Sequence, residues 1–161
     1  MTSPSPSHFP PLTDSWDGKD VTVLVVDDNE QNLELLEAYL EDLRCDLRLA
    51  RDGMEALESV AAKRPDIILL DVMMPRMSGS QACAKLKAEA GTRDIPIVMV
   101  TALNEVSDVE RAIECGADDF LSKPVNKLEL LTRVKSLVRI SKMQQELQRA
   151  LGQLRSFRQG G

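Results

Sequence analysis

Five short runs of aliphatic and β-branched residues recur along this chain, and stretches with helical spacing separate them. Apolar runs of this length are typical of strands that are buried on both faces of a parallel sheet. The repeated alternation of strand and helix predicts an α/β fold, a doubly wound five-stranded parallel sheet with helices on both faces. The predicted strands are Val21–Val26, Cys45–Ala50, Asp66–Leu70, Ile95–Val100 and Asp119–Leu121.

The segments between these strands carry the apolar spacing of helices. After the first strand, the stripe consists of Leu33, Leu35, Leu36, Tyr39, Leu40 and Leu43. Further helices are predicted over Met54–Ala62, Ser80–Ala88 and Val106–Cys115, and from Asn126 almost to the C-terminus. The predicted organisation is a flexible leader (residues 1–20), a folded domain (21–139) and a helical extension (140–161).

Histidine and cysteine usage excludes several kinds of site. The only histidine, His8, lies in the predicted leader, so the folded part has none for a Ser/His/Asp or Cys/His nucleophile or for a histidine-based metal site. The three cysteines form no CxxC pair, which argues against a zinc site and a disulfide framework. Any chemistry in the folded part must therefore use carboxylates, lysine and hydroxyls.

The composition favours a cytoplasmic protein that binds neither membranes nor nucleic acid. No apolar run approaches the roughly 20 residues that a membrane helix needs, and the polar N-terminus lacks the apolar core of a secretory signal. The net charge is −6, although from Leu131 onward seven Lys or Arg residues accompany a single acid, Glu146. This basic segment could meet an acidic partner. No helix-turn-helix follows it, and the net charge is wrong for a DNA-binding domain.

Polar residues follow four of the predicted strands, where ligand sites of parallel sheets form. Asp27 and Asp28 follow the first strand, Asp71 the third, Thr101 the fourth, and Lys123 lies just beyond the fifth. Converging carboxylates repel one another, and a hard divalent cation such as Mg²⁺ relieves that repulsion. Taken singly, the pair Asp27-Asp28 also fits a helix cap, Asp71 also fits a turn, and a lysine before a proline indicates little. As an ordered set they indicate a carboxylate that attacks a phosphoryl group, with lysine and hydroxyl donors beside it.

The same segments resemble the receiver domain of two-component response regulators. The resemblance covers about Val21 to Arg139 and implies the flavodoxin-like strand order 2-1-3-4-5. The segments that carry it are VLVVDDNE (Val23–Glu30), DIILLDVMMPRMSG (Asp66–Gly79), PIVMVTA (Pro96–Ala102) and GADDFLSKP (Gly116–Pro124).

The resemblance implies a role for each acidic residue. Asp71 would accept a phosphoryl group from a histidine kinase or phosphotransfer protein. Asp28 would bind Mg²⁺ directly, Asp27 would act largely through metal-bound water, and Met73 would supply a backbone carbonyl. The chain would then be a switch and not an enzyme, apart from its own phosphorylation and slow dephosphorylation.

It also implies how the phosphorylated state is held and read. Lys123 and Thr101 would bind phosphoryl oxygens, Phe120 occupies the aromatic switch position, and the Lys123–Pro124 bond would be cis. Because Phe120 lacks the hydroxyl of the more frequent tyrosine, its switching would depend on packing. Met73 and Leu103 would flank the acyl phosphate without hydrogen-bonding to water, which predicts slow self-dephosphorylation.

Two further interpretations concern the extension. Six apolar residues follow one another at spacings of 3-4-3-4-3, a heptad seam that predicts a homodimer: Ile140, Met143, Leu147, Ala150, Leu154 and Phe157. The alternative is a single amphipathic helix that folds back on its own domain, since the seam is short and contains Gly152. Within the family, the sequence most resembles receivers fused to diguanylate cyclases, so the chain is either a stand-alone regulator or the receiver part of a larger one.

The alternative from a different class of protein is a Mg²⁺-dependent phosphohydrolase with an aspartyl nucleophile. Such an enzyme would carry its nucleophile after the first strand in a DxD arrangement, where this chain has Asp27-Asp28-Asn29. Counting turnovers separates the two hypotheses, because a switch takes up one phosphoryl group per chain.

Overall fold

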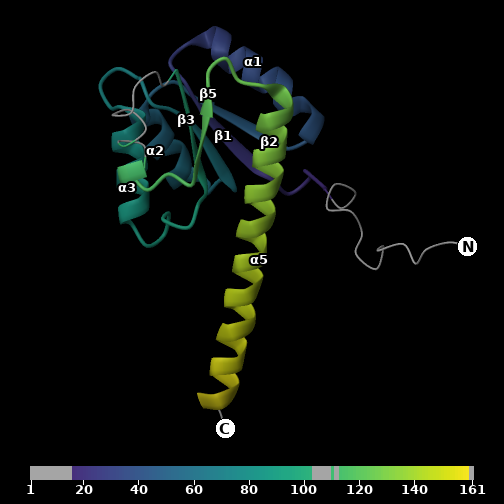
Figure 1. Cartoon of the computed structure of the whole chain (residues 1–161). Coiled ribbons are helices and arrows are strands. Elements are labelled where there is room, and N and C mark those ends of the chain that lie inside the picture. The colour runs from purple at the N-terminus through teal and green to yellow at the C-terminus, as the bar shows by residue number, and fades with distance from the viewer. Residues whose placement is uncertain (1–15, 103–109, 111–112, 160–161) are drawn as a thin grey trace, which may run out of the picture.

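The computed structural model contains a parallel sheet of five strands in the order β2-β1-β3-β4-β5, with helices on both faces (Figure 1). It describes residues 16–102, 110 and 113–159. The predicted fold class and strand order are confirmed. The strands are β1 (Thr22–Val26), β2 (Asp46–Ala50), β3 (Ile67–Asp71), β4 (Ile97–Thr101) and β5 (Asp119–Ser122); the helices are α1 (Glu30–Leu40), the 3-10 helix η2 (Glu41–Leu43), α2 (Gly53–Ala62), α3 (Gly79–Ala88) and α5 (Lys127–Gln159).

Two hydrophobic clusters, one on each face of the sheet, hold the helices in place. Side chains of α2 and α3 such as Val60 and Leu86 pack on one face, together with alternate residues of β1, β3 and β4. Side chains of α1 and α5 such as Leu36 and Val134 pack on the other. The central strands β1, β3 and β4 are buried along their whole length, as their apolar runs predict, and the polar residues at their ends, Thr22, Asp71 and Thr101, are buried with them.

The strand ends differ by a residue or two from the predicted ones. β3 includes Asp71 and β4 includes Thr101, so both functional candidates are the last residues of their strands. β4 begins at Ile97 and not at Ile95, because the intervening Pro96 has no N–H to donate to a ladder. The positions of Asp71 and Thr101 are therefore fixed by the sheet itself and not by a loop.

The helices differ from the predicted ones at two places. α1 ends at Leu40, and the predicted apolar stripe continues to Leu43 through η2, which Arg44 terminates in the left-handed conformation (φ 53°). The helix predicted over Val106–Cys115 falls mostly outside the described residues, as does the leader up to residue 15. The described end of the leader is docked, since the Trp16 indole N–H donates to the Leu43 carbonyl at 3.1 Å.

Helix α5 begins beside the carboxyl ends of the strands, crosses the sheet and projects well beyond it (Figure 1). Val134 and Val138 are buried against the domain, whereas the side chains of residues 143–156 are all exposed. Residues 143–156 of the extension are therefore not buried against their own domain, whereas Ser141 at its start still is. None of the helices in the described ranges has the length and hydropathy needed to cross a membrane.

Candidate functional site

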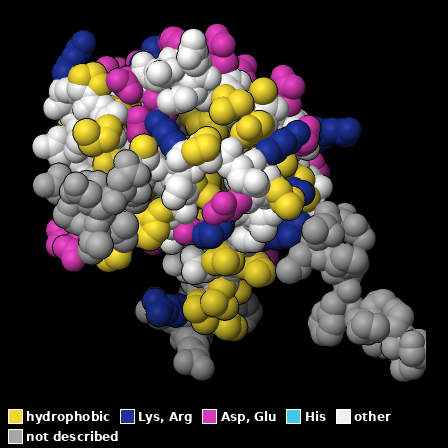
Figure 2. All heavy atoms as spheres, turned by 45° about the horizontal axis from the view of Figure 1, so that its top comes forward, with side chains coloured by type: hydrophobic (Ala, Val, Ile, Leu, Met, Phe, Trp, Pro, Cys, Tyr) yellow, Lys and Arg dark blue, Asp and Glu magenta, His cyan; other side chains and the backbone are white. Residues whose placement is uncertain are grey.

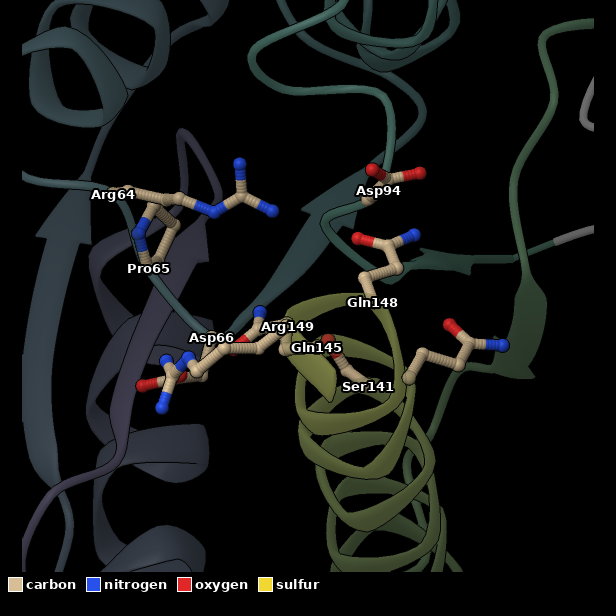
Figure 3. A pocket seen from close by; sticks show the side chains of 9 residues that line it. Arg64, Pro65, Asp66, Asp94, Ser141, Gln145, Gln148 and Arg149 are labelled. Atoms are coloured by element: carbon tan, nitrogen blue, oxygen red, sulfur yellow. The ribbon is translucent and has the colours of Figure 1, made fainter. Parts of the chain in front are cut away.

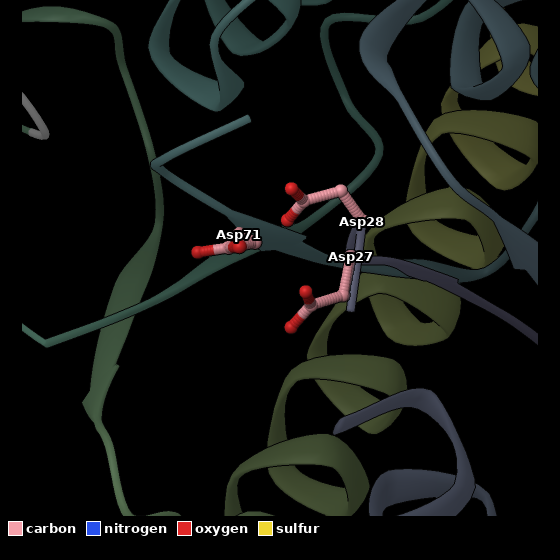
Figure 4. Close-up of side chains that lie close together, drawn as sticks. All are labelled: Asp27, Asp28 and Asp71. Carbon is pink, nitrogen blue, oxygen red and sulfur yellow. The ribbon is translucent and has the colours of Figure 1, made fainter. Parts of the chain in front are cut away.

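Three carboxylates gather at the carboxyl edge of the sheet (Figure 4). Asp27 and Asp28 directly follow β1, and Asp71 ends the neighbouring parallel strand β3. One carboxylate oxygen from each residue lies within 4.8 Å of those of the other two. Asp27 and Asp71 are buried, with exposed fractions of 1% and 5%, whereas Asp28 is exposed. The predicted convergence of these three residues is therefore observed.

Asn29, and not either aspartate, caps the helix that follows. Its side-chain oxygen accepts the backbone N–H groups of Gln31 and Asn32, which have no partner within α1. The buried Asp27 accepts the N–H of Asn29 at 2.9 Å and so fixes the turn. No hydrogen bond or ion pair within the described residues holds Asp28. The carboxylates of Asp27 and Asp28 are therefore not used to cap α1.

The loop after β3 packs tightly against the strand that ends in Asp71. The Gly79 N–H donates to the Val72 carbonyl at 2.9 Å, and a Cβ at Gly79 would lie only 1.9 Å from the carbonyl oxygen of Asp71. Ser78 and Gln81 form a capping box at the start of α3. This close approach requires glycine, and it fixes the backbone at the acidic cluster.

Lys123 joins the two buried carboxylates. Its ammonium nitrogen lies 3.2 Å from Asp27 Oδ2 and 3.4 Å from Asp71 Oδ1. Its backbone N–H donates to the Thr101 carbonyl at 2.9 Å, and the Lys123–Pro124 bond is cis, as predicted. When all carboxylates are ionised, three negative charges face one positive charge, an excess of two. The donor set therefore fits a hard divalent cation with oxygen ligands.

Thr101 and Phe120 lie on the two strands beyond β3. Thr101 is 3% exposed and follows Val100, the register partner of Asp71 on β4. Phe120 is half-buried on β5 and packs against the hydrophobic cluster on the α2 and α3 side. Their positions are compatible with contact to a group on Asp71, although no hydrogen bond joins either side chain to the acids in the described structure.

Met73 lies beside the buried carboxylate with its side chain in solvent. Its backbone N–H donates to Asp71 Oδ1 at 3.3 Å, and its side chain is 75% exposed. The second residue predicted to flank an acyl phosphate, Leu103, lies outside the described residues.

The carboxyl of Asp71 is held in a state that resists ionisation. Burial raises the pKa of Asp71 to about 6 from an ordinary 3.8, and the charge of Asp27 adds to this effect. The ammonium of Lys123 and the N–H of Met73 oppose it. The carboxyl of Asp71 binds its proton more tightly in the folded protein than in the unfolded one. The free energy of unfolding therefore falls as the pH rises from 3.8 to about 6, and it falls no further from this cause at higher pH.

We expect Asp71→Asn to stabilise the metal-free protein at neutral pH. The amide keeps the shape and removes the buried charge, which should raise the free energy of unfolding by about 1–3 kcal/mol, since one pKa unit corresponds to about 1.4 kcal/mol. Thermal unfolding at pH 7 and pH 4.5 in chelator would measure this, and the gain should shrink at the lower pH. An equal or lower melting temperature for the variant at pH 7 would contradict it.

The sequence matches the family model described as the response regulator receiver domain over residues 23–135. The chain belongs to that family. It is 48% identical over 125 residues to the response regulator PleD of Caulobacter vibrioides, covering 78% of this chain and 28% of that protein. It is 41% identical to the response regulator MprA of Mycobacterium ulcerans, covering 78% of this chain and 53% of the relative. The chain thus spans little more than half of either regulator at most.

Solved structures show the same fold. A receiver domain of a signal transduction histidine kinase from Syntrophus aciditrophicus superposes with a TM-score of 0.71 at 38% identity, covering 74% of this chain and 90% of that one. The receiver domain of a sensor histidine kinase from Pseudomonas aeruginosa, with a magnesium ion coordinated in its active-site cleft, gives 0.70 at 31% identity, covering 74% and 98%. The receiver family is thus established on the sequence and on the structure.

Proposed function

We propose that Asp71 accepts one phosphoryl group from a phosphohistidine on a histidine kinase or phosphotransfer protein. A carboxylate oxygen of Asp71 attacks phosphorus, the P–N bond breaks, and the leaving imidazole takes up a proton. The observation that carries this proposal is the position of the buried Asp71 beside Asp27 and under the ammonium of Lys123. A buried carboxylate with a lysine donor at this distance is placed for nucleophilic attack and for stabilising the product.

Mg²⁺ is the proposed cofactor, held by Asp28 and Asp71 directly, by Asp27 largely through water, and by the backbone carbonyl of Met73. The related receiver with magnesium in its cleft supports this proposal, as does the donor set of three carboxylates within reach of one another. When bound, the ion would offset the charge of the entering phosphoryl group. Asp28 suits a direct ligand because it is exposed and no described residue binds its carboxylate.

The other proposed roles belong to residues on the neighbouring strands. The ammonium of Lys123 stays beside Asp71. On phosphorylation it binds oxygens of the phosphoryl group in place of the carboxylate oxygens that it contacts in the unphosphorylated protein. Thr101 donates its hydroxyl to the same group, and Phe120 follows this change by repacking. Phosphorylation would thereby switch self-association or the docking of a partner protein. The proposed setting is the cytoplasm, where we expect such phosphoryl donors.

We also propose that this receiver works within a larger regulator, of the kind that joins a receiver to a diguanylate cyclase. The identity of 48% with a regulator of which the chain covers only 28% supports this proposal. Helix α5, which projects from the domain, is the segment that would connect the two parts.

Counting phosphoryl groups distinguishes this switch from a phosphohydrolase. Incubated with acetyl phosphate and Mg²⁺, the chain should take up one phosphoryl group and then stop. Repeated turnover of phosphate esters, measured as phosphate released per chain, would contradict the switch and favour the hydrolase.

The flanking residues should make the phosphorylated state long-lived. After removal of the donor we expect slow decay, because the side chains of Met73 and Leu103 cannot hold an attacking water. Met73→Asn should accelerate decay on the order of 10-fold, since a positioned water gains in effective concentration. The same change at the exposed Met54 should have no effect. Decay of the unmodified protein within seconds would contradict this prediction.

A further inference from the structure

An apolar hollow lies where helix α5 leaves the domain, and we call it the Trp16 hollow. Its volume is about 520 Å³, and its apolar walls are Trp16, Val21, Val138, Ile140 and Met143. Ile140 and Met143 are 48% and 59% exposed. Figure 2 shows hydrophobic side chains gathered where the helix leaves the domain. A concave apolar surface that is open to solvent marks a binding site.

A second hollow beside the same helix is polar and offers no such site. There Gln145, Gln148 and Arg149 of α5 lie opposite Arg64 and Asp94 of the domain (Figure 3). Water satisfies amide and charged groups of this kind, and an apolar occupant would have to displace it. The Trp16 hollow is therefore the one of these two hollows that an apolar segment would fill.

Trp16, the first described residue, is fixed in the wall of this hollow. Its indole N–H donates to the Leu43 carbonyl at 3.1 Å, and the Arg139 guanidinium lies 5.9 Å from its ring centroid. The chain that precedes Trp16 is therefore tethered at the edge of the hollow. A tethered segment binds at the high effective concentration that its short connection sets, so it has an advantage over any separate molecule.

The tethered chain contains a cluster of apolar residues within reach of the hollow: Phe9, Pro10, Pro11 and Leu12. At roughly 3.3 Å per residue, Leu12 can lie up to about 13 Å from Trp16, and Phe9 up to about 23 Å. The two prolines already have a fixed φ, so the segment loses less conformational entropy when it is held in one conformation. Its composition therefore suits docking more than free movement in solvent.

The charged residues of the hollow also fit this segment. They are two acids and two bases, and no ion pair joins them within the described part of the chain: Asp17, Asp20, Arg139 and Lys142. The Arg139 nitrogen Nη2 is buried and has no hydrogen-bond acceptor among the described residues. Asp14 is the only acid before residue 16, two positions from the edge of the hollow. An apolar segment with a single carboxylate matches apolar walls whose arginine lacks an acceptor.

We propose that residues 9–14 of the same chain occupy the Trp16 hollow. Their apolar side chains cover Ile140 and Met143, and the Asp14 carboxylate accepts a hydrogen bond from Arg139. The docked segment contacts the domain and the helix together, so it fixes the direction in which α5 leaves the domain. This inference does not depend on the proposed phosphorylation, and its test requires none.

Fluorescence of the full chain tests the proposal, because Trp16 is its only tryptophan and forms a wall of the hollow. The double variant Phe9→Ser and Leu12→Ser should increase quenching of this fluorescence by acrylamide at least about 2-fold, since the apolar contact that covers the hollow is lost. As a matched control, Pro4→Ser and Pro6→Ser change the same part of the chain outside the apolar cluster. This variant should show the quenching of the unmodified chain.

Hydrogen exchange gives a second readout, from the opposite side of the contact. The backbone amides of residues 12–14 should exchange more slowly in the unmodified chain than in Met143→Gln, which alters the wall of the hollow and keeps the helix propensity. Unchanged melting temperatures would show that all variants are folded.

Both readouts should be independent of protein concentration, because the contact lies within one chain. Equal quenching in the unmodified chain and in the Phe9 and Leu12 variant would overturn the proposal and leave the hollow to a separate molecule. Quenching that weakens as the protein concentration rises would overturn it too, since a second copy of the chain would then be the occupant.

Discussion

Replacing Lys123 by alanine is expected to lower the rate of phosphorylation by acetyl phosphate about 100- to 1,000-fold, the effect of removing one donor from a developing negative charge. The ammonium is within 3.4 Å of both buried carboxylates and is the only cation paired with them among the described residues. Without it, no cationic side chain of the described residues would offset the charge of Asp27 or of the entering phosphoryl group. The initial rate of phosphoryl uptake at fixed Mg²⁺ measures the effect.

Lys127 offers a matched control four positions further along the chain. It pairs with Asp42 at 2.8 Å on the surface, where both side chains are about half exposed. Lys127→Ala should therefore phosphorylate at the unmodified rate. Thermal unfolding of both variants would show whether a loss of rate reflects a loss of fold. A near-normal rate for Lys123→Ala would contradict the role assigned to this residue.

Asp28→Asn is expected to raise the Mg²⁺ concentration required for half-maximal phosphorylation about 10- to 100-fold. The amide keeps the size of the side chain but removes one anionic ligand from the proposed metal site, and hard cations depend on ligand charge. Because Asp28 is exposed, the change should cost little stability. The rate should recover at high Mg²⁺, which distinguishes weakened metal binding from a damaged acceptor.

The control for this variant is Asp20→Asn, the same loss of charge at the opposite end of β1. Asp20 is exposed and precedes the strand, whereas Asp28 follows it. Its Mg²⁺ dependence should match that of the unmodified chain. If both variants shift the requirement equally, the effect of Asp28 is one of overall charge, and the proposed direct coordination is wrong.

Much of the fold could be predicted from the sequence because each buried strand is an uninterrupted apolar run. Val23–Val26 and Ile67–Leu70 are buried on both faces, and their sequences contain nothing polar to suggest otherwise. The sequence does not define where the strands end, because a polar residue such as Asp71 is equally suited to the last position of a strand and to a turn. The pairing of Asp71 with Val100 of β4 makes Asp71 a strand residue, and the local sequence does not encode this pairing.

The candidate site could be predicted as a set of residues but not as a set of contacts. Parallel strands place their carboxyl ends at one edge, so the convergence of Asp27 and Asp71 follows from strand order. The bridging position of Lys123 between them depends on the path of the chain after β5. The cap at Asn29 was missed, although an asparagine directly before a helix is a recognised signal.

The extension shows the same limit. Its heptad spacing predicts an apolar seam, but spacing alone does not reveal which way that seam faces relative to the domain. That direction follows only once Val134 and Val138 are known to be the buried residues. The exposed Leu151, which the heptad spacing passes over, lies on the same side of the helix as the seam.

The most direct test of the central claim is to locate the phosphoryl group on the chain. After reaction with acetyl phosphate and Mg²⁺, peptide mass analysis under acidic conditions should find one phosphoryl group, on the peptide that contains Asp71, in the unmodified protein. Asp71→Asn should carry none. A phosphoryl group on another residue, or undiminished labelling of Asp71→Asn, would contradict the assignment of Asp71 as the acceptor.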